Sequence, residues 1–209
     1  MVITGIAEWH KGKYLISLND EPAFALYGKE IGEYGLKEGA ELSDEEYRRI
    51  LDDVLIKRTK SRTLHILDKN DKTEKELRDK LKEGMYPEEA IDAAVEAAKR
   101  GRFLDDKRYA CQYVYEKSRT KSRRMIEAEL KRKGISEDLI SSAFSDMDEK
   151  EGMEDREEAL VLKLIKKRLP DPGALDNASK EKLYRYLTGK GFEFEKCRSV
   201  LDRYLEGYG

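Results

Sequence analysis

The sequence predicts a mainly α-helical protein: three tandem three-helix units, preceded by a small β-rich domain of three strands. Three observations predict this fold class. Charged residues make up 41% of the 209-residue chain, hydrophobic residues 39%, and there are only 4 prolines, which is typical of a helix-rich soluble protein. β-prone runs are concentrated in residues 2–27, where turn sequences separate them. An apolar pattern recurs three times along the chain, and its paired members are Leu77 and Leu81, Ile126 and Leu130, and Leu183 and Leu187.

The first 58 residues are predicted to form a β-meander with a covering helix. Three apolar runs, at 2–6, 14–18 and 23–27, are separated by turn sequences at 10–13 and 19–22. A sheet of this size has one apolar face that another element must cover. A capping box at 43–46 opens a helix with one apolar stripe, formed by Tyr47, Ile50, Leu51, Val54 and Leu55. This helix is expected to close over the sheet and to lead into the first three-helix unit.

Each copy of the apolar pattern has the same order of residues. A hydroxyl residue stands four positions before the pair, and a large apolar residue follows five positions after it. The hydroxyl residues are Thr73, Ser122 and Ser179, and the later apolar residues are Tyr86, Ile135 and Phe192. Units this small cannot bury their own apolar faces, so they are expected to stack. The predicted units span 59–104, 105–148 and 149–209, and such arrays usually offer a surface to a partner rather than a catalytic pocket.

Local signals predict where the helices of these units begin and end. Thr73 opens a helix with a capping box, Gly84 ends that helix, and Pro87 is expected in the first turn of the next one. Ser122 has the position of a second helix cap, and the third unit is expected to begin near Asp155. Each unit is therefore predicted to contain three helices.

Conventional catalytic and ligand-binding motifs are missing from the sequence. The two histidines, His10 and His65, lie in different segments without a companion at metal-ligand spacing, and the two cysteines lack CxxC spacing. Asp105 and Asp106 are better explained as a helix N-cap than as a metal site. No P-loop, dinucleotide-binding or nucleophile-elbow motif occurs. The sequence therefore predicts a protein that is not an enzyme and that holds no cofactor or metal.

The beginning of the chain and its hydropathy bear on location. The N-terminus lacks the basic and apolar regions of a signal peptide, and no run approaches the roughly 18 apolar residues of a membrane span. The net charge of −2 predicts no general affinity for nucleic acid. A cytoplasmic, reducing environment is expected.

The distribution of charge singles out the middle unit. Residues 117–133 hold eight Lys or Arg residues against two Glu, whereas residues 145–158 hold eight Asp or Glu residues against two basic ones. The helix dipole explains cations in a last turn but not Arg123 and Arg124 in a first turn, which favours acids. Basic residues placed in this way indicate contact with a phosphate backbone or an acidic protein surface, and a solvated charged face is an equal alternative. The candidate contact residues are Lys117, Arg119, Lys121, Arg123, Arg124, Lys131, Arg132 and Lys133.

Tyrosines accompany this basic segment. Tyr109 and Tyr113 are one helical turn apart and are therefore expected to pack in the core of their unit. Tyr115 is expected to point elsewhere, and a tyrosine ring beside cations could stack on a base.

Several of these segments resemble a known family. Residues 103–110 (FLDDKRYA), followed by Tyr113 and Val114, resemble the signature of the bacterial RecX regulatory proteins. Residues 123–135 (RRMIEAELKRKGI) are similar to the second-repeat motif of that family. Shorter similarities at 75–78 and 186–192 match its first and third repeats, although the segment 188–190 stands where a more basic run is usual. The resemblance extends from about residue 60 to residue 205.

The resemblance implies a function as well as a fold, in which the tandem three-helix units form an elongated, curved array. RecX proteins bind the RecA recombinase, lie in the groove of its filament on single-stranded DNA, and usually inhibit its strand exchange, ATP hydrolysis and co-protease activity. We therefore expect a monomeric regulator of RecA, active in recombination, DNA repair and the SOS response, whose basic segment contacts the recombinase or single- or double-stranded DNA. The alternative is a stand-alone nucleic-acid-binding module, because three-helix units with basic loops can dock in grooves. An enzyme would need a pocket with perturbed acids or bases, which the sequence does not offer.

Overall fold

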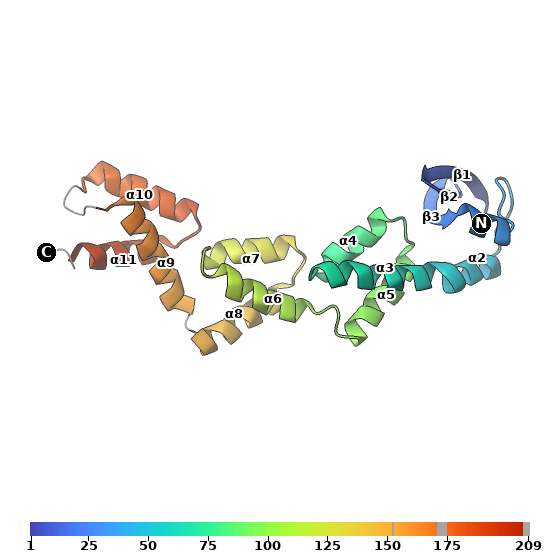
Figure 1. Cartoon of the computed structure of the whole chain (residues 1–209). Helices are drawn as coiled ribbons and strands as arrows, with labels where there is room; N and C mark the ends of the chain where they lie inside the picture. The colour runs from blue at the N-terminus through green and yellow to red at the C-terminus, as the bar shows by residue number, and fades with distance from the viewer. Residues whose placement is uncertain (152, 171–174, 207–209) are drawn as a thin grey trace. The chain divides into compact units, whose positions relative to one another are not determined.

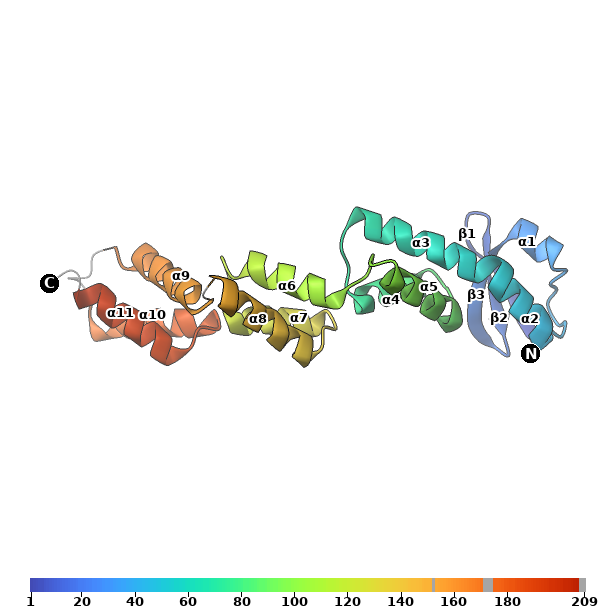
Figure 2. The same ribbon diagram turned by 90° about the horizontal axis from the view of Figure 1, so that it is seen from below.

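The chain forms two compact units, Met1–Asp105 and Asp106–Gly209, and each is described by itself (Figure 1). The computed structural model describes residues 1–151, 153–170 and 175–206, except for the side chains of 150–151 and 153–155. The first unit contains a β-sheet and the helices up to residue 100, and the second is helical throughout its described part (Figure 2). The fold is therefore mainly helical with a small N-terminal sheet, as predicted.

The N-terminal sheet has three antiparallel strands in the order β1-β2-β3. Its strands are β1 (Ile3–His10), β2 (Lys13–Leu18) and β3 (Glu21–Tyr27). The turn predicted at 19–22 is shorter than expected, because Asn19 and Asp20 alone make it, with φ of 50° and 68°. Asn and Asp tolerate this left-handed region, which a two-residue hairpin turn requires. Pro22 lies within β3, an edge strand, next to a register shift at Ile16/Ser17 where its missing N–H is tolerated.

One continuous helical run covers the sheet and enters the first three-helix unit. It consists of α2 (Asp44–Ile50), a π-helical turn η1 (Leu51–Leu55) and α3 (Ile56–Lys69), and it follows the short helix α1 (Gly28–Glu33). The predicted capping box is confirmed, since the Glu46 N–H donates to Ser43 Oγ at 3.2 Å and the Ser43 N–H to Glu46 Oε2 at 2.9 Å. Ile50, Leu51 and Leu55 are fully buried against sheet residues such as Phe24, which confirms the covering helix.

The first three-helix unit is completed by α4 (Glu74–Glu83) and α5 (Glu88–Arg100). Thr73 caps α4 with the predicted capping box. Pro87 is the N-cap of α5 and not a residue of its first turn, because its extended backbone (ψ 152°) stands just outside the helix. Leu77 and Leu81 are fully buried in one core cluster with residues of α5. The boundary predicted between 58 and 59 falls inside α3, and the domain limits as a whole stay predictions.

The second unit contains six helices in its described part. They are α6 (Asp106–Lys117), α7 (Arg123–Arg132), α8 (Glu137–Glu151), α9 (Met153–Arg168), α10 (Asn177–Gly189) and α11 (Phe194–Glu206). Ile126 and Leu130 are buried in a core formed with α6 and α8, and Leu183 and Leu187 in a core formed with α9 and α11. The side chain of Asp155, near which the third unit was predicted to begin, lies outside the described residues.

One hydroxyl residue of the repeated pattern has a different role from the other two. Ser122 caps α7 by accepting a hydrogen bond from the Met125 N–H, but Ser179 lies inside α10. Asp176 caps α10 instead, and its carboxylate accepts from the Ser179 N–H at 2.8 Å. The helix begins earlier here because an aspartate, also a strong N-cap residue, stands three positions before the serine.

The same turn follows the paired apolar residues in all three copies of the pattern. The backbone N–H of Tyr86, Ile135 and Phe192 donates to the carbonyl of the second paired residue at 3.4, 3.1 and 3.3 Å. This bond needs a left-handed residue one position earlier. Gly134 (φ 86°) and Gly191 (φ 84°) supply it in two copies, but Met85 (φ 55°) supplies it in the first. The regular spacing of the later apolar residues therefore reflects one shared helix-ending turn.

Met85 offers a test of this turn. A residue with a Cβ is strained in the left-handed region, so we expect Met85→Gly to be more stable than Met85→Ala by about 1 kcal/mol. The alanine variant is the matched control, because both changes remove the half-buried side chain and only glycine removes the strain. Urea unfolding followed by circular dichroism measures the difference, and equal stability of the two variants would contradict the role of the turn.

Candidate partner and nucleic-acid interface

Three of the predicted contact residues lie near two tyrosines of α6, on a surface that we call the α6–α7 face. The contact residues are Lys117, Lys121 and Lys133, and the tyrosines are Tyr109 and Tyr113. Tyr109 and Tyr113 are stacked with ring centroids 6.0 Å apart, and both pack partly buried against the core, as predicted. The ammonium of Lys117 lies 5.5 Å from the Tyr113 ring centre, and that of Lys133 lies 5.5 and 5.8 Å from the two ring centres. Lys121 is linked to Tyr113 through Glu129, which accepts a hydrogen bond from each of them. Cations at these distances are attracted by the negative faces of the rings, which holds their charge at the surface.

Glu129 organises this face from α7. Its carboxylate accepts hydrogen bonds from Lys121 Nζ at 2.5 Å and from the Tyr113 hydroxyl at 2.8 Å. Burial raises the pKa of Tyr113, the bond to Glu129 raises it further, and together they bring it to about 12. Burial opposes the charge of Glu129, but the bonds from Lys121 and Tyr113 outweigh it and lower the pKa of that carboxyl. At neutral pH the carboxylate is therefore charged and forms an ion pair with Lys121, whereas no carboxylate of the described residues pairs with Lys117.

Arg119 lies with Tyr115, away from the two core tyrosines. Its guanidinium donates to the Tyr115 hydroxyl at 3.0 Å and lies 5.0 Å from the centre of that ring. The Tyr115 side chain is 42% exposed, which agrees with the expectation that it does not join the core. Arg156 of α9 approaches the same ring at 5.4 Å. Tyr115 is therefore an exposed ring between two arginines.

Arg123 is held within the fold. Its Nε donates to Glu127 Oε1 at 3.0 Å, its Nη1 lies 3.8 Å from Asp148 Oδ2, and its guanidinium lies 4.5 Å from the Phe144 ring centre. Arg124 is exposed next to it and lines a cleft with Gly191 and other residues of the following helices. The two adjacent arginines therefore differ in their contacts, since Arg123 has carboxylate partners, but both are exposed and line the same cleft.

The tertiary structure supplies the acid that the first turn of α7 lacks. Glu157 of α9 is 7% exposed, and its Oε1 accepts a hydrogen bond from the Arg123 backbone N–H at 3.0 Å. Its Oε2 accepts from Lys196 Nζ of α11 at 2.7 Å. A carboxylate at a helix N-terminus satisfies free N–H groups and is favoured by the dipole. Glu157 therefore supplies the negative charge that the dipole favours at the start of α7. The position of Arg123 and Arg124 in this first turn is for that reason weaker evidence of a partner site.

The remaining candidates lie at the other end of α7. Lys131 pairs with Glu137 at 2.6 Å, and the bond from this carboxylate raises the pKa of Lys131. Arg132 is exposed in the last turn. Cations in this position are favoured by the helix dipole, as expected from the sequence.

Carboxylate partners separate the candidates into two groups. In the described part of the chain, no ion pair engages Lys117, Arg119 or Arg124. The acidic segment 145–158 meets basic groups, since Asp146, Asp148, Glu157 and Glu158 pair with Lys107, Arg123, Lys196 and Arg203. Among the eight candidates, Lys117, Arg119 and Arg124 are therefore the ones with no ion pair to a described carboxylate and no interaction beyond those given above.

The sequence interpretation missed a basic cleft in the first unit. His10 and His65, which were interpreted as isolated, both line it, together with Arg58 and Arg62 of α3. A signal was present, because Arg58, Arg62 and His65 follow one another at i, i+4 and i+7 and therefore share one face of a helix. The sequence analysis followed the spacing of apolar residues and did not consider the spacing of basic ones.

Other functional classes leave few traces in the described part of the chain. No group of three or more His, Cys, Asp or Glu side chains gathers there as ligands for a metal ion. No helix in the same residues has both the length and the apolar character to cross a membrane. Cys197 is fully buried, and burial raises the pKa of its thiol to about 11, which makes it unreactive at neutral pH.

Comparison with known proteins agrees with the repeat pattern. Family models of the first, second and third three-helix domains of RecX match residues 60–96, 105–143 and 155–201. The regulatory protein RecX of Clostridium beijerinckii is 32% identical over 203 residues, which cover 96% of this chain and 93% of that protein. That of Caldanaerobacter subterraneus is 31% identical and covers 97% and 99%. A crystal structure of regulatory protein RecX superposes with a TM-score of 0.65 at 27% identity, covering 96% of this chain and 98% of the other. The chain therefore belongs to the RecX family of regulatory proteins, a non-enzymatic family.

Proposed function

We propose that this protein binds the RecA recombinase filament on single-stranded DNA and inhibits its recombinase, ATPase and co-protease activities. Membership of the RecX family supports this proposal. The observation that carries it furthest is that three of the eight candidate cations, Lys117, Arg119 and Arg124, have no carboxylate partner among the described residues. Such charges attract phosphates or an acidic protein surface over a long range.

The neighbouring contacts prepare these cations for binding. Lys117 and Arg119 rest on Tyr113 and Tyr115, so little side-chain freedom is lost when a partner arrives. Arg123 contacts Glu127, Asp148 and Phe144, so it also holds together the helices around it. Several modest contacts from successive three-helix units along a filament would add up to strong binding. The protein would act as a monomer in the cytoplasm.

Reversal of the three open charges tests the proposal. We expect the variant Lys117→Glu, Arg119→Glu, Arg124→Glu to require about tenfold more protein for half-inhibition of RecA, because attraction at the interface becomes repulsion. The measurement is ATP hydrolysis by RecA on single-stranded DNA, titrated with each protein at substoichiometric amounts.

The matched control reverses three exposed cations of the last three helices. Lys163, Lys167 and Arg185 are exposed and have no carboxylate partner in the described part of the chain, so their reversal changes the net charge equally. The control should inhibit as the unaltered protein does. Equal loss in both variants would contradict a contact centred on Lys117, Arg119 and Arg124, and no inhibition by the unaltered protein would contradict the proposed function itself.

A further inference from the structure

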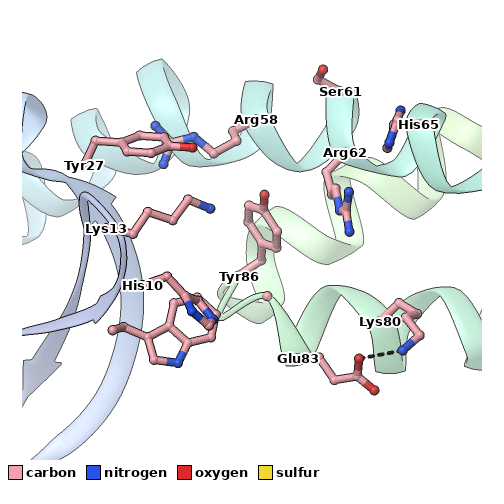
Figure 3. Close-up of a pocket in the computed structure, with 12 residues that line it drawn as sticks. His10, Lys13, Tyr27, Arg58, Ser61, Arg62, His65, Lys80, Glu83 and Tyr86 are labelled. Carbon is pink, nitrogen blue, oxygen red and sulfur yellow. Dashed lines mark hydrogen bonds and ion pairs between the residues drawn. The ribbon is translucent and has the colours of Figure 1, made fainter.

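A polar cleft of about 660 Å³ lies within the first unit, between the sheet and the helices that follow it (Figure 3). This volume is within the range of small-ligand sites. Its walls come from the end of β1 and the start of β2, the end of β3, α3, and the segment from α4 to Tyr86. The sheet domain and the first three-helix unit therefore build it together.

Uncompensated positive charge is concentrated in this cleft. The lining residues include Lys13, Arg58, Arg62 and Lys80 but a single carboxylate, Glu83, which pairs with Lys80 at 2.7 Å. Arg58 is paired with Glu30. In the described part of the chain no carboxylate pairs with Lys13 or Arg62. Lys13 extends from the sheet toward the Tyr86 ring, and Arg62 extends from α3 on the other side of that ring (Figure 3).

Aromatic rings stand beside these charges. Tyr27 is 44% exposed, and Lys13 Nζ and the Arg58 guanidinium lie 5.2 and 4.9 Å from its ring centre. Trp9 and His10 form a second pair, with ring centroids 4.2 Å apart. An exposed ring beside cations is the combination that stacks on the bases and binds the phosphates of single strands.

The cleft is also built by the backbone. A Cβ on Gly84 would lie 2.8 Å from Tyr86 Cε2, so only glycine lets that ring rest against the end of α4. Arg58 is fixed by its bond to the Ala25 carbonyl at 3.4 Å as well as by Glu30. Burial raises the pKa of Tyr86, and the charges of Arg58 and Arg62 oppose that rise. Its hydroxyl stays protonated at neutral pH and is available as a hydrogen-bond donor.

We propose that this cleft binds single-stranded nucleic acid, with Lys13 and Arg62 on its phosphates and the Tyr27 ring against a base. The site is separate from the cations of the second unit, and it acts without the recombinase. A single strand is favoured over a duplex, since its unpaired bases can stack on an exposed ring, whereas the bases of a duplex are stacked inside it. It is favoured over an acidic peptide, because a peptide would use the cations and leave the exposed rings without a role.

The test measures fluorescence anisotropy of a labelled oligothymidylate with the full chain and no RecA. We expect Lys13→Glu, Arg62→Glu to bind about tenfold more weakly and to show a shallower dependence of affinity on salt, because two phosphate contacts are lost. The matched control is Lys37→Glu, Lys69→Glu, which changes the net charge equally at two exposed positions outside the cleft. Circular dichroism of each variant checks that the fold is kept.

A second variant separates base contact from charge. Tyr27→Leu keeps apolar bulk and removes the aromatic face, so it should weaken binding of oligothymidylate by about tenfold and leave binding of an abasic strand unchanged. Equal affinity of the charge-reversal and control variants would overturn the site. Unchanged oligothymidylate binding by Tyr27→Leu, an equally sensitive duplex, or stronger binding of an oligoglutamate peptide than of DNA would overturn its assignment to single strands.

Discussion

Replacing Glu157 with alanine is expected to lower the free energy of unfolding of the second unit by about 3 kcal/mol. The Glu157 carboxylate is buried and joins three helices, because it belongs to α9, accepts from the Arg123 N–H of α7 and pairs with Lys196 of α11. The alanine variant leaves the ammonium of Lys196, whose side chain is 18% exposed, without this carboxylate. The loss of one carboxylate thus removes a helix cap and an ion pair together.

Urea unfolding and amide hydrogen exchange measure this effect. The Arg123 amide should exchange faster in the variant, which locates the change at the start of α7. Glu158→Ala is the matched control, since the neighbouring carboxylate pairs with Arg203 at the surface and such pairs contribute less than about 1 kcal/mol. A similar loss in both variants would show that Glu157 does not have the joining role described.

Gly191→Ala is expected to cost about 2–3 kcal/mol in the same unit. Gly191 has φ of 84°, which strains any residue with a Cβ. The added Cβ would also lie 2.6 Å from Ser122 Oγ and 3.2 Å from Met125 Cγ. Ser122 Oγ caps α7 and donates to the Lys190 carbonyl at 2.8 Å, so displacing it disturbs two hydrogen bonds. The substitution therefore forces the turn at residue 191 away from the start of α7.

Gly189→Ala is the matched control for that prediction. Gly189 ends α10, and a Cβ there meets no atom within 4 Å. Alanine is the better helix former, so the control should be neutral or more stable by up to about 1 kcal/mol. Thermal unfolding followed by circular dichroism compares the two proteins, and a Gly191→Ala variant as stable as Gly189→Ala would contradict the tight packing.

Much of the fold could be predicted because its signals are local. These signals depend on residues a few positions apart: the i, i+4 spacing within each apolar pair, the capping boxes at Ser43 and Thr73, and the three β-prone runs. The structure confirms all of them. The errors concern two prolines. Pro22 was predicted in a turn although an edge strand accepts it, and Pro87 was predicted in the first turn of α5 although it is the N-cap.

The candidate surface was harder to predict, because charge acts through space. Lys121 and Lys131 look like open cations in the sequence, but Glu129 and Glu137 form ion pairs with them. Arg123 looks misplaced at a helix start until Glu157, 34 positions later, is brought to the same point. The eight candidate contacts therefore stay a proposal, with Lys117, Arg119 and Arg124 as its strongest members.

The sequence by itself determined which segments become helices and strands, which apolar residues form each core, and to which family the chain is similar. These properties follow from periodicity and capping, which are set within a few turns of chain. The tertiary structure alone decided which charges remain open to a partner, and it alone assembled the basic, aromatic cleft of the first unit from β1, β2, β3, α3 and α4. The physical reason is that ion pairs and clefts depend on distances between side chains far apart in sequence, and only folding sets those distances.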